Sequence, residues 1–338
     1  MPMTDAPSTL TSVVERTQAV KAGAAVVAAH FLGRTAVFVL GEESLLLVPP
    51  DGEPHAVGVH AGGILCSAVD KTRIITGGDD GKVMATAADG STTALASDSK
   101  HRWIDHVAIG PPHAVAWSAG KHAYVRVGES GERMLELPST VGAMAFAPKG
   151  LRVGIAHYNG VTLWFPNAET APEVLGWKGS HLGVTFSPDN RFLVSSMQEP
   201  MLHGWRLADG KSMRMAGYGA RVRSLAWTAS GKWLATSGST QLVLWPFAGK
   251  EGPMGKEPRM LAPAESQVDV LACHPRQEVV AAGYANGLVL LVRVEDGAEV
   301  LAKKPGNAPV TALAWDASGD TLAFGTEDGE AGIVRLGS

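Results

Sequence analysis

The stretch Val310 to Leu336, VTALAWDASGDTLAFGTEDGEAGIVRL, constrains the fold most, because it reads as three short strands in a row. VTALAW alternates small or polar residues with bulky apolar ones, as in a strand whose side chains point to opposite faces. TLAFGT and EAGIVRL follow as two further strands, separated by the turn signals DASGD and EDG. Three strands of about five residues are not stable alone in water, so the unit must stack on similar neighbours.

Similar units recur along the whole chain. Their first strands end near eight bulky residues that lie 37 to 46 residues apart: Leu32, Val69, Ile109, Phe146, Phe186, Trp227, Cys273 and Trp315. A period of about 40 residues with four short strands is typical of a β-propeller blade. We therefore predict an all-β propeller of four-stranded antiparallel blades. Eight blades are favoured; seven is the alternative, with unit one, the least typical, as the miscounted unit.

The last unit has no fourth strand, and a spare strand precedes the first unit. Residues 11–20 alternate weakly, as an edge strand does. If they pair with the third strand of the last unit, the ring closes without a long exposed edge. We therefore predict a flexible N-terminus over residues 1–10 and a single propeller over 11–338, with 11–20 as the closing strand of the last blade.

Several motifs resemble those of the WD-repeat family of propellers, over about Ala24 to Leu336. The first-strand-and-turn patterns are MAFAPKG, VTFSPDN, LAWTASG and LAWDASG. Tight turns are marked at Asp80, Asn159, Asn286 and Asp328, and the family's third-strand tryptophan has counterparts in Trp164, Trp205 and Trp245. The resemblance implies a protein-interaction scaffold.

The chain also departs from the family pattern. No aspartate follows any of the three tryptophans, and the family's Gly-His pair survives only loosely before His60 and His181. The family's relay of His, Ser/Thr, Trp and Asp is therefore incomplete in every blade. Because each relay bond adds only about 1 kcal/mol net, we expect apolar stacking between blades to contribute more to stability.

The composition narrows the compartment and the partners. Hydrophobic residues make up 45 % of the chain and charged residues 18 %, which excludes the disordered class. The net charge of −4 gives no general attraction to nucleic acid or anionic membrane.

Cys66 and Cys273 lie in different units and form no disulfide framework. Because His30 and Arg34 interrupt the apolar run of residues 20–40, it fits the first unit better than a signal peptide. We expect a cytoplasmic protein without a membrane span.

Local catalytic and nucleic-acid signals are weak. Residues 204–212, GWRLADGKS, have five residues between their glycines and read as strand, turn and strand, whereas a phosphate loop needs four and a following helix. No nucleophile elbow, HExxH or CxxC occurs. A basic cluster with interleaved aromatic residues could contact nucleic acid, but the acidic total disfavours this. Its residues are Trp205, Arg206, Lys211, Arg214, Tyr218, Arg221 and Arg223.

The leading hypothesis is a monomeric, non-catalytic scaffold that needs no cofactor and binds a protein or peptide partner. The partner would bind the top face and channel mouth, which the starts of first strands and the turns between second and third strands form. The residues predicted for this surface are Trp103, Asp105, His106, Tyr158, His181, Arg221, Arg223, Asp269 and Tyr284.

Two alternatives remain open. One is a zinc-binding protein that uses histidines of the same face, although imidazole ligands must converge on the metal rather than merely share a face. Its candidate ligands are His60, His101, His106, His157 and His181. The other is an enzyme whose site lies in the channel and is assembled from single residues of several blades.

Overall fold

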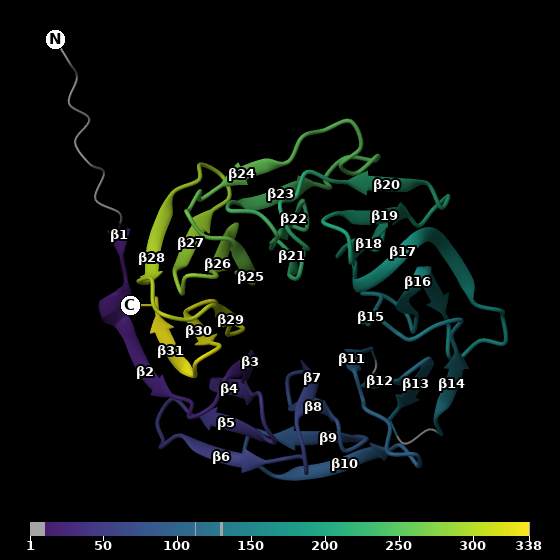
Figure 1. Cartoon of the computed structure of the whole chain (residues 1–338), viewed down its shortest axis with the longest axis horizontal. Coiled ribbons are helices and arrows are strands. Elements are labelled where there is room, and N and C mark those ends of the chain that lie inside the picture. Colours follow the sequence, from purple (N-terminus) through teal and green to yellow (C-terminus); the bar gives the residue numbers. More distant parts are fainter. Residues whose placement is uncertain (1–10, 112, 129–130, 338) are drawn as a thin grey trace.

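A computed structural model describes residues 11–111, 113–128 and 131–337. The predicted flexible segment 1–10 lies outside these residues. The described strands form sheets arranged in a ring, with each first strand near the centre and each last strand at the rim (Figure 1). Within the described residues the only helix is the short 3-10 helix η1, Val14–Arg16. The predicted all-β propeller of antiparallel blades is confirmed.

The strands follow the chain around the ring. The first three sheets hold β3 (Val26–Leu32), β4 (Thr35–Leu40), β5 (Ser44–Val48) and β6 (His55–Gly58); β7 (Ile64–Val69), β8 (Arg73–Gly78), β9 (Lys82–Ala87) and β10 (Thr92–Ser97); and β11 (His106–Gly110), β12 (Ala114–Ala119), β13 (His122–Val127) and β14 (Arg133–Glu136). A six-stranded sheet follows, with β15 (Ala143–Phe146), β16 (Val153–Trp164), β17 (Glu173–Phe186), β18 (Phe192–Met197), β19 (Leu202–Arg206) and β20 (Ser212–Met215).

Three sheets complete the ring. They hold β21 (Leu225–Trp227), β22 (Trp233–Thr236), β23 (Leu242–Pro246) and β24 (Arg259–Leu261); β25 (Val268–Cys273), β26 (Val279–Tyr284), β27 (Val289–Arg293) and β28 (Glu299–Lys303), with β1 (Thr11–Ser12) at the outer edge; and β29 (Val310–Trp315), β30 (Thr321–Thr326) and β31 (Glu330–Arg335), with β2 (Thr17–Lys21) as the fourth strand.

The number of sheets corrects the favoured count. Among the described residues, hydrogen bonding joins the strands into seven sheets, the number held as the alternative. Units four and five share the six-stranded sheet, because β17 pairs with β16 along its first half and with β18 along its second half. Unit one, expected to be the miscounted unit, is a regular four-stranded sheet. Each of the eight sequence units therefore has its own first strand in the structure. The first strands of units four and five, β15 and the second half of β17, belong to the same six-stranded sheet.

The N-terminal strand closes the ring as predicted, but over a shorter range. β2 pairs antiparallel with β31, from Thr17 opposite Val334 to Lys21 opposite Glu330. The preceding residues do not belong to this strand, since β1 pairs in parallel with β28 of the neighbouring sheet. The 3-10 helix η1 connects the two short strands. The N-terminal segment thus joins two adjacent sheets, not one.

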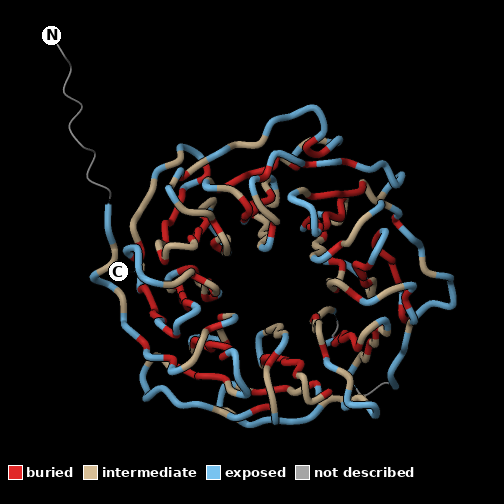
Figure 2. Tube along the Cα trace, viewed as in Figure 1, coloured by how far each residue is buried: buried red, intermediate tan, exposed pale blue. Residues whose placement is uncertain are grey.

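Buried residues lie along the strands of every blade, while much of the outer rim is exposed (Figure 2). Clusters of buried apolar side chains join neighbouring repeat units, as expected for stacked blades. One cluster joins the last unit to the first and includes Phe38, which is fully buried, and Ile333. Another joins units five and six through Phe192 and Phe247, whose rings meet edge to face at 5.3 Å. Burying such large side chains contributes about 1.5–3 kcal/mol each, so this packing is the main source of stability.

Polar relays are partial, as the sequence predicted. In unit two, His60 contacts Thr76 Oγ1 at 2.8 Å and Asp80 Oδ1 at 2.9 Å. In unit six no histidine takes part; the Tyr218 hydroxyl lies 2.7 Å from Thr236 Oγ1 and accepts a 2.6 Å hydrogen bond from Trp245 Nε1. A buried tyrosine therefore replaces the family's histidine in that blade.

Candidate functional site at the channel mouth

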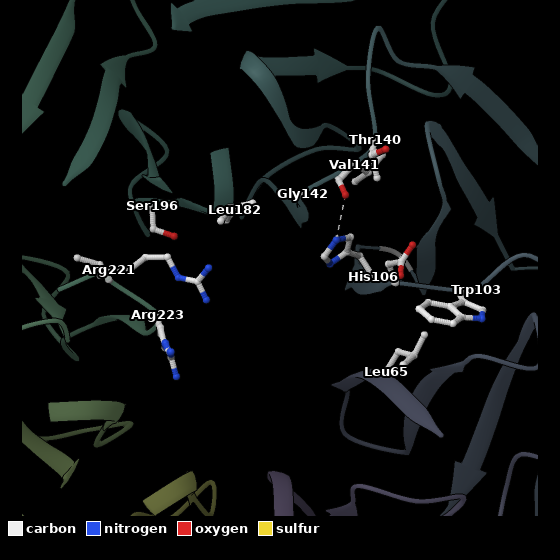
Figure 3. Close-up of a pocket in the computed structure, with 12 residues that line it drawn as sticks. Leu65, Trp103, His106, Thr140, Val141, Gly142, Leu182, Ser196, Arg221 and Arg223 are labelled. Carbon is white, nitrogen blue, oxygen red and sulfur yellow. Dashed lines mark hydrogen bonds between the residues drawn. The ribbon is translucent and has the colours of Figure 1, made fainter. Parts of the chain in front are cut away.

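A cavity of about 640 Å³ opens at the inner end of units two to six, on the face predicted to bind a partner. We call it the mouth cavity. Figure 3 shows its wall, to which side chains from several blades contribute. The lining residues are Leu65, Trp103, Asp105, His106, Thr140, Val141, Gly142, Leu182, Ser196, Arg221, Val222 and Arg223. Five of the nine predicted surface residues are among them: Trp103, Asp105, His106, Arg221 and Arg223.

A simple alternation places these side chains. A buried residue that anchors the backbone lies at the start of β7, shortly before β11, β15 and β21, and where β17 begins to pair with β18. The residue after each anchor faces the cavity, because neighbouring side chains of an extended backbone point in opposite directions. The buried anchors are Ile64, Ile104, Val141, His181 and Val222, none more than 5 % exposed. The residues that follow them are Leu65, Asp105, Gly142, Leu182 and Arg223, and all five line the cavity.

Two apolar residues in this series were missed by the sequence analysis. Leu65 is 42 % exposed and Leu182 is 36 % exposed. Both lie where the register of the first strand shifts, between Ile64 and Cys66 and between His181 and Gly183. A bulge of this kind adds an unpaired residue to the strand and redirects its side chain. The sequence feature that could have identified these two residues is an apolar residue that directly follows the first buried residue of the unit.

The two arginines project into the cavity from one wall (Figure 3). Val222 between them is 1 % exposed and packs into the core between units five and six. The backbone N–H of Arg223 donates to Ser237 Oγ at 3.1 Å, which fixes the segment before β21. Arg221 Nη1 donates to Gln198 Oε1 at 3.2 Å. Anchoring of the backbone therefore orients both guanidinium groups toward the open space.

The opposite wall carries Trp103, Asp105 and His106. Trp103 is 61 % exposed, whereas Ile104 beside it is buried and its carbonyl accepts a bond from Cys66 Sγ at 3.2 Å. His106 Nε2 lies 3.2 Å from the carbonyl oxygen of Val141. Burial is the main cause that lowers the pKa of His106, which favours the neutral ring. His106 thus donates to the next repeat unit, while Trp103 is free to contact a partner.

Two of the predicted surface residues are corrected by the structure. His181 is 1 % exposed; its Nδ1 lies 2.7 Å from Ser195 Oγ and its Nε2 lies 3.0 Å from the Trp177 carbonyl oxygen. Tyr284 is fully buried, and its hydroxyl donates to the Ala262 carbonyl oxygen at 2.7 Å. His181 lies within β17, where the pairing with β18 begins, and Tyr284 ends β26, but both side chains are buried in the core. Neither can contact a partner directly.

The remaining two lie outside the mouth cavity. Tyr158 is 57 % exposed and lies where the register of β16 shifts, between Tyr158 and Gly160. Asp269 follows the buried Val268 at the start of β25 and accepts a bond from Gln267 Nε2 at 3.2 Å. Burial raises the pKa of Asp269, and the nearby Arg223 offsets part of this effect. Asp269 therefore lies close enough to influence the arginine wall.

The candidate zinc ligands do not converge. Within the part of the chain that the structure describes, no group of three or more His, Cys, Asp or Glu side chains is placed to hold a metal ion. His60 and His181 are occupied by the bonds given above, and His157 contacts Thr162 Oγ1 at 2.9 Å and the Tyr158 carbonyl oxygen at 2.8 Å. These contacts are those of structural histidines.

The predicted basic cluster is divided between two regions. Arg206 pairs with Asp209 and Glu251, and Lys211 Nζ lies 3.1 Å from Glu251. Glu251 belongs to the segment between β23 and β24, which contacts the neighbouring blade through these ion pairs. The sequence that resembled a phosphate loop spans β19, a turn and β20. Ion pairing thus occupies the outer part of the cluster and leaves Arg221 and Arg223 at the cavity.

A second cavity, of about 780 Å³, is lined by the opposite ends of first strands from units one, two, seven and eight. His30 contributes to its wall, and His30 Nε2 lies 2.8 Å from Ser67 Oγ. Burial lowers the pKa of His30 to about 4 and raises the pKa of the Cys273 thiol to about 12. Both groups are therefore neutral near pH 7, and the thiol is not activated as a nucleophile.

Comparison with known proteins supports the family. Residues 211–246 match the family model described as "WD40: WD domain, G-beta repeat", and this segment contains the Tyr218, Thr236 and Trp245 relay. No curated protein matches the chain. The crystal structure of the computationally designed Ika8 protein is similar, with a TM-score of 0.76 and 18 % identity over 93 % of this chain and 97 % of that chain. Such low identity shows the fold alone. The matched segment and the ring of antiparallel sheets support a relationship to the WD-repeat β-propellers.

Proposed function

We propose that the chain is a non-catalytic scaffold that binds a protein or peptide partner at the mouth cavity. WD-repeat propellers generally act as protein-interaction scaffolds and typically lack catalytic activity. The observation that carries the proposal is the side-chain content of one concave site: an exposed tryptophan, two arginines and two exposed leucines. Trp and Arg are the residue types most enriched among the residues that dominate interface energies.

Rigidity supports the same proposal. Buried residues hold the backbone beside the cavity side chains: Ile104 follows Trp103, and Val222 lies between Arg221 and Arg223. A partner therefore does not have to order this surface when it binds, and less of its interaction energy is lost as conformational entropy.

The proposal includes a monomer in a reducing, cytoplasmic compartment. Cys66 and Cys273 are both free thiols, and the closed ring leaves no open blade for a second copy to complete. Among the described residues, no helix has the length and apolar character to cross a bilayer.

Affinity capture from the source cell tests the function. The bait proteins are the wild type, the double variant Arg221→Glu/Arg223→Glu, and the control Arg214→Glu, which alters an exposed arginine of β20 outside the cavity. We expect the wild type and the control to retain the same partner and the double variant to lose it. If the double variant recovers every partner undiminished, the mouth cavity is not the binding surface.

A further inference from the structure

The two walls of the mouth cavity differ in chemistry, and this difference indicates the kind of partner. Arg221 and Arg223 extend from one wall, while Leu65 and Trp103 lie together on the facing wall (Figure 3). Leu182 lies on the arginine side. The site therefore combines cationic donors with exposed apolar surface.

The arginine donors are largely unused. Among the described residues, neither guanidinium forms an ion pair with a carboxylate, in contrast to Arg206 and Arg293, which both pair with aspartates. The side chain of Arg221 has one hydrogen bond, to the neutral amide of Gln198. Each guanidinium presents a planar fork of N–H groups that matches the two oxygens of a carboxylate. The cavity thus offers donors for an anionic side chain.

The apolar side chains require a second feature in the same partner. Trp103, Leu65 and Leu182 are 61, 42 and 36 % exposed, and they border one cavity instead of lying singly on the surface. Burial of such surface favours association. A large aliphatic or aromatic side chain next to the anionic group would cover it.

Two carboxylates limit the charge that the cavity accepts. Asp105 lines the cavity, and Asp269 lies close enough to Arg223 to interact with its charge. Two arginines near two aspartates give no net positive field, and the whole chain carries a net charge of −4. The two guanidinium groups can still form direct hydrogen bonds to one or two carboxylates, but the site has no extended positive field to attract a polyanion such as nucleic acid.

We propose that the mouth cavity binds a peptide segment in which an Asp or Glu side chain lies within one or two residues of a large aliphatic or aromatic side chain. The inference rests on the proposed function and specifies its partner. The acidic group pairs with Arg221 and Arg223, and the apolar group packs on Leu65, Trp103 and Leu182.

A displayed library of random heptapeptides, panned against the full-length protein, tests this pairing. The selected peptides are measured by fluorescence polarisation with the wild type, Arg221→Glu/Arg223→Glu, Leu65→Asp and the two controls Arg214→Glu and Val174→Asp. Val174 is 60 % exposed on β17 outside the cavity. Thermal melts of every variant separate loss of binding from loss of fold.

We expect acidic-apolar peptides to be enriched and to bind about tenfold or more weakly to each cavity variant, with both controls unchanged. The double charge reversal should instead bind peptides in which the acidic residue is replaced by Lys. If cavity-dependent peptides are enriched without acidic residues, the partner chemistry is wrong while docking at the mouth stands. If no selected peptide responds to the cavity variants, both proposals fail. Stronger binding of a polyanion such as heparin at the arginines would also overturn the peptide assignment.

Discussion

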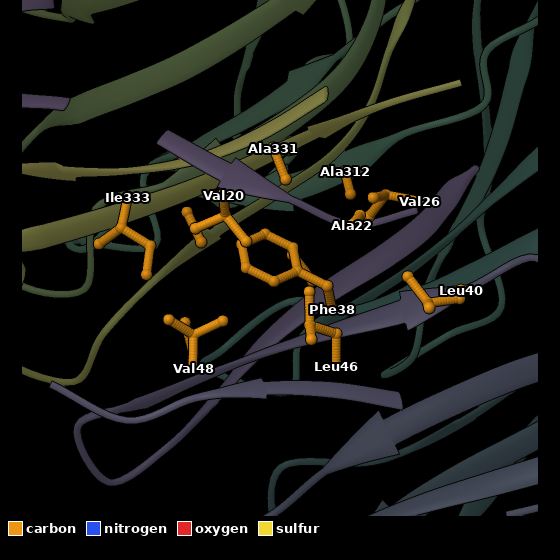
Figure 4. Close-up of a cluster of buried hydrophobic side chains, with 13 residues drawn as sticks. Val20, Ala22, Val26, Phe38, Leu40, Leu46, Val48, Ala312, Ala331 and Ile333 are labelled. Atoms are coloured by element: carbon orange, nitrogen blue, oxygen red, sulfur yellow. The ribbon is translucent and has the colours of Figure 1, made fainter. Parts of the chain in front are cut away.

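Val20, near the start of the chain, pairs in register with Ala331, near its end. The side chains of both residues belong to one buried cluster, in which Phe38 of the next sheet lies between the last and first units (Figure 4). Val20 is 7 % exposed, whereas Ala19 on the other face of β2 is exposed. Ring closure therefore depends on a contact between the two ends of the sequence.

The first prediction concerns this closure. Val20→Asp places a charge in an apolar cluster and should lower the free energy of unfolding by about 3 kcal/mol or more. Ala19→Asp, on the solvent face of the same strand, should change it by no more than about 0.5 kcal/mol. Chemical denaturation of the two variants measures the difference. Equal stability of the two would mean that β2 does not hold the ring closed.

The second prediction concerns the relay in unit six. Tyr218→Phe removes the acceptor of the 2.6 Å bond from Trp245 Nε1 and leaves that donor buried. The loss should be about 1–3 kcal/mol, the usual result of leaving a buried polar group unpaired. Tyr158→Phe removes a hydroxyl from an exposed side chain and is the matched control. Thermal unfolding that shows the same loss for both variants would contradict a structural role for the Tyr218 hydroxyl.

The third prediction concerns acid. His203 is 1 % exposed and stacks on Trp177 at 3.9 Å, with neither ring nitrogen hydrogen bonded within the described structure. Burial lowers the pKa of His203 to about 4 from its ordinary value of 6.5. Because the unfolded chain binds the proton more readily, stability should be fully present above pH 6.5. It should be lost progressively as the pH falls toward 4.

The size of this effect is about 3 kcal/mol for His203 alone, at about 1.4 kcal/mol for each unit of pKa. Denaturation curves at pH 7, 5 and 4 measure it. His203→Phe should retain the aromatic stack and show a shallower loss of stability with acid than the wild type, whatever its stability at pH 7. An unchanged slope would mean that other groups cause the acid sensitivity.

Much of the fold was predictable because the repeat is local. Alternation within VTALAW and the turn residues around Asp328 define strands without knowledge of distant contacts. The merging of units four and five was not predictable in this way. The merging depends on β17, which continues from Glu173 to Phe186 without a break. This strand pairs first with β16 and then with β18, so its own residues do not predict its length.

The site was predictable only in part, because exposure at a strand start depends on register. Leu65 and Leu182 are exposed where bulges shift the pairing, although their apolar character alone suggested core positions. His181 and Tyr284 are polar or amphipathic residues at the expected face, yet their hydrogen-bond partners lie in the core. A shift of one residue moves a side chain from one face to the other.

Hydrogen–deuterium exchange of the complex with a captured partner tests docking at the mouth cavity most directly. We predict slower amide exchange on binding in the segments that contain Trp103 to His106 and Arg221 to Arg223, with little change in the outer strands β10, β14 and β24. Protection confined to those outer strands, with the two cavity segments unchanged, would contradict the assignment of the mouth cavity as the binding surface.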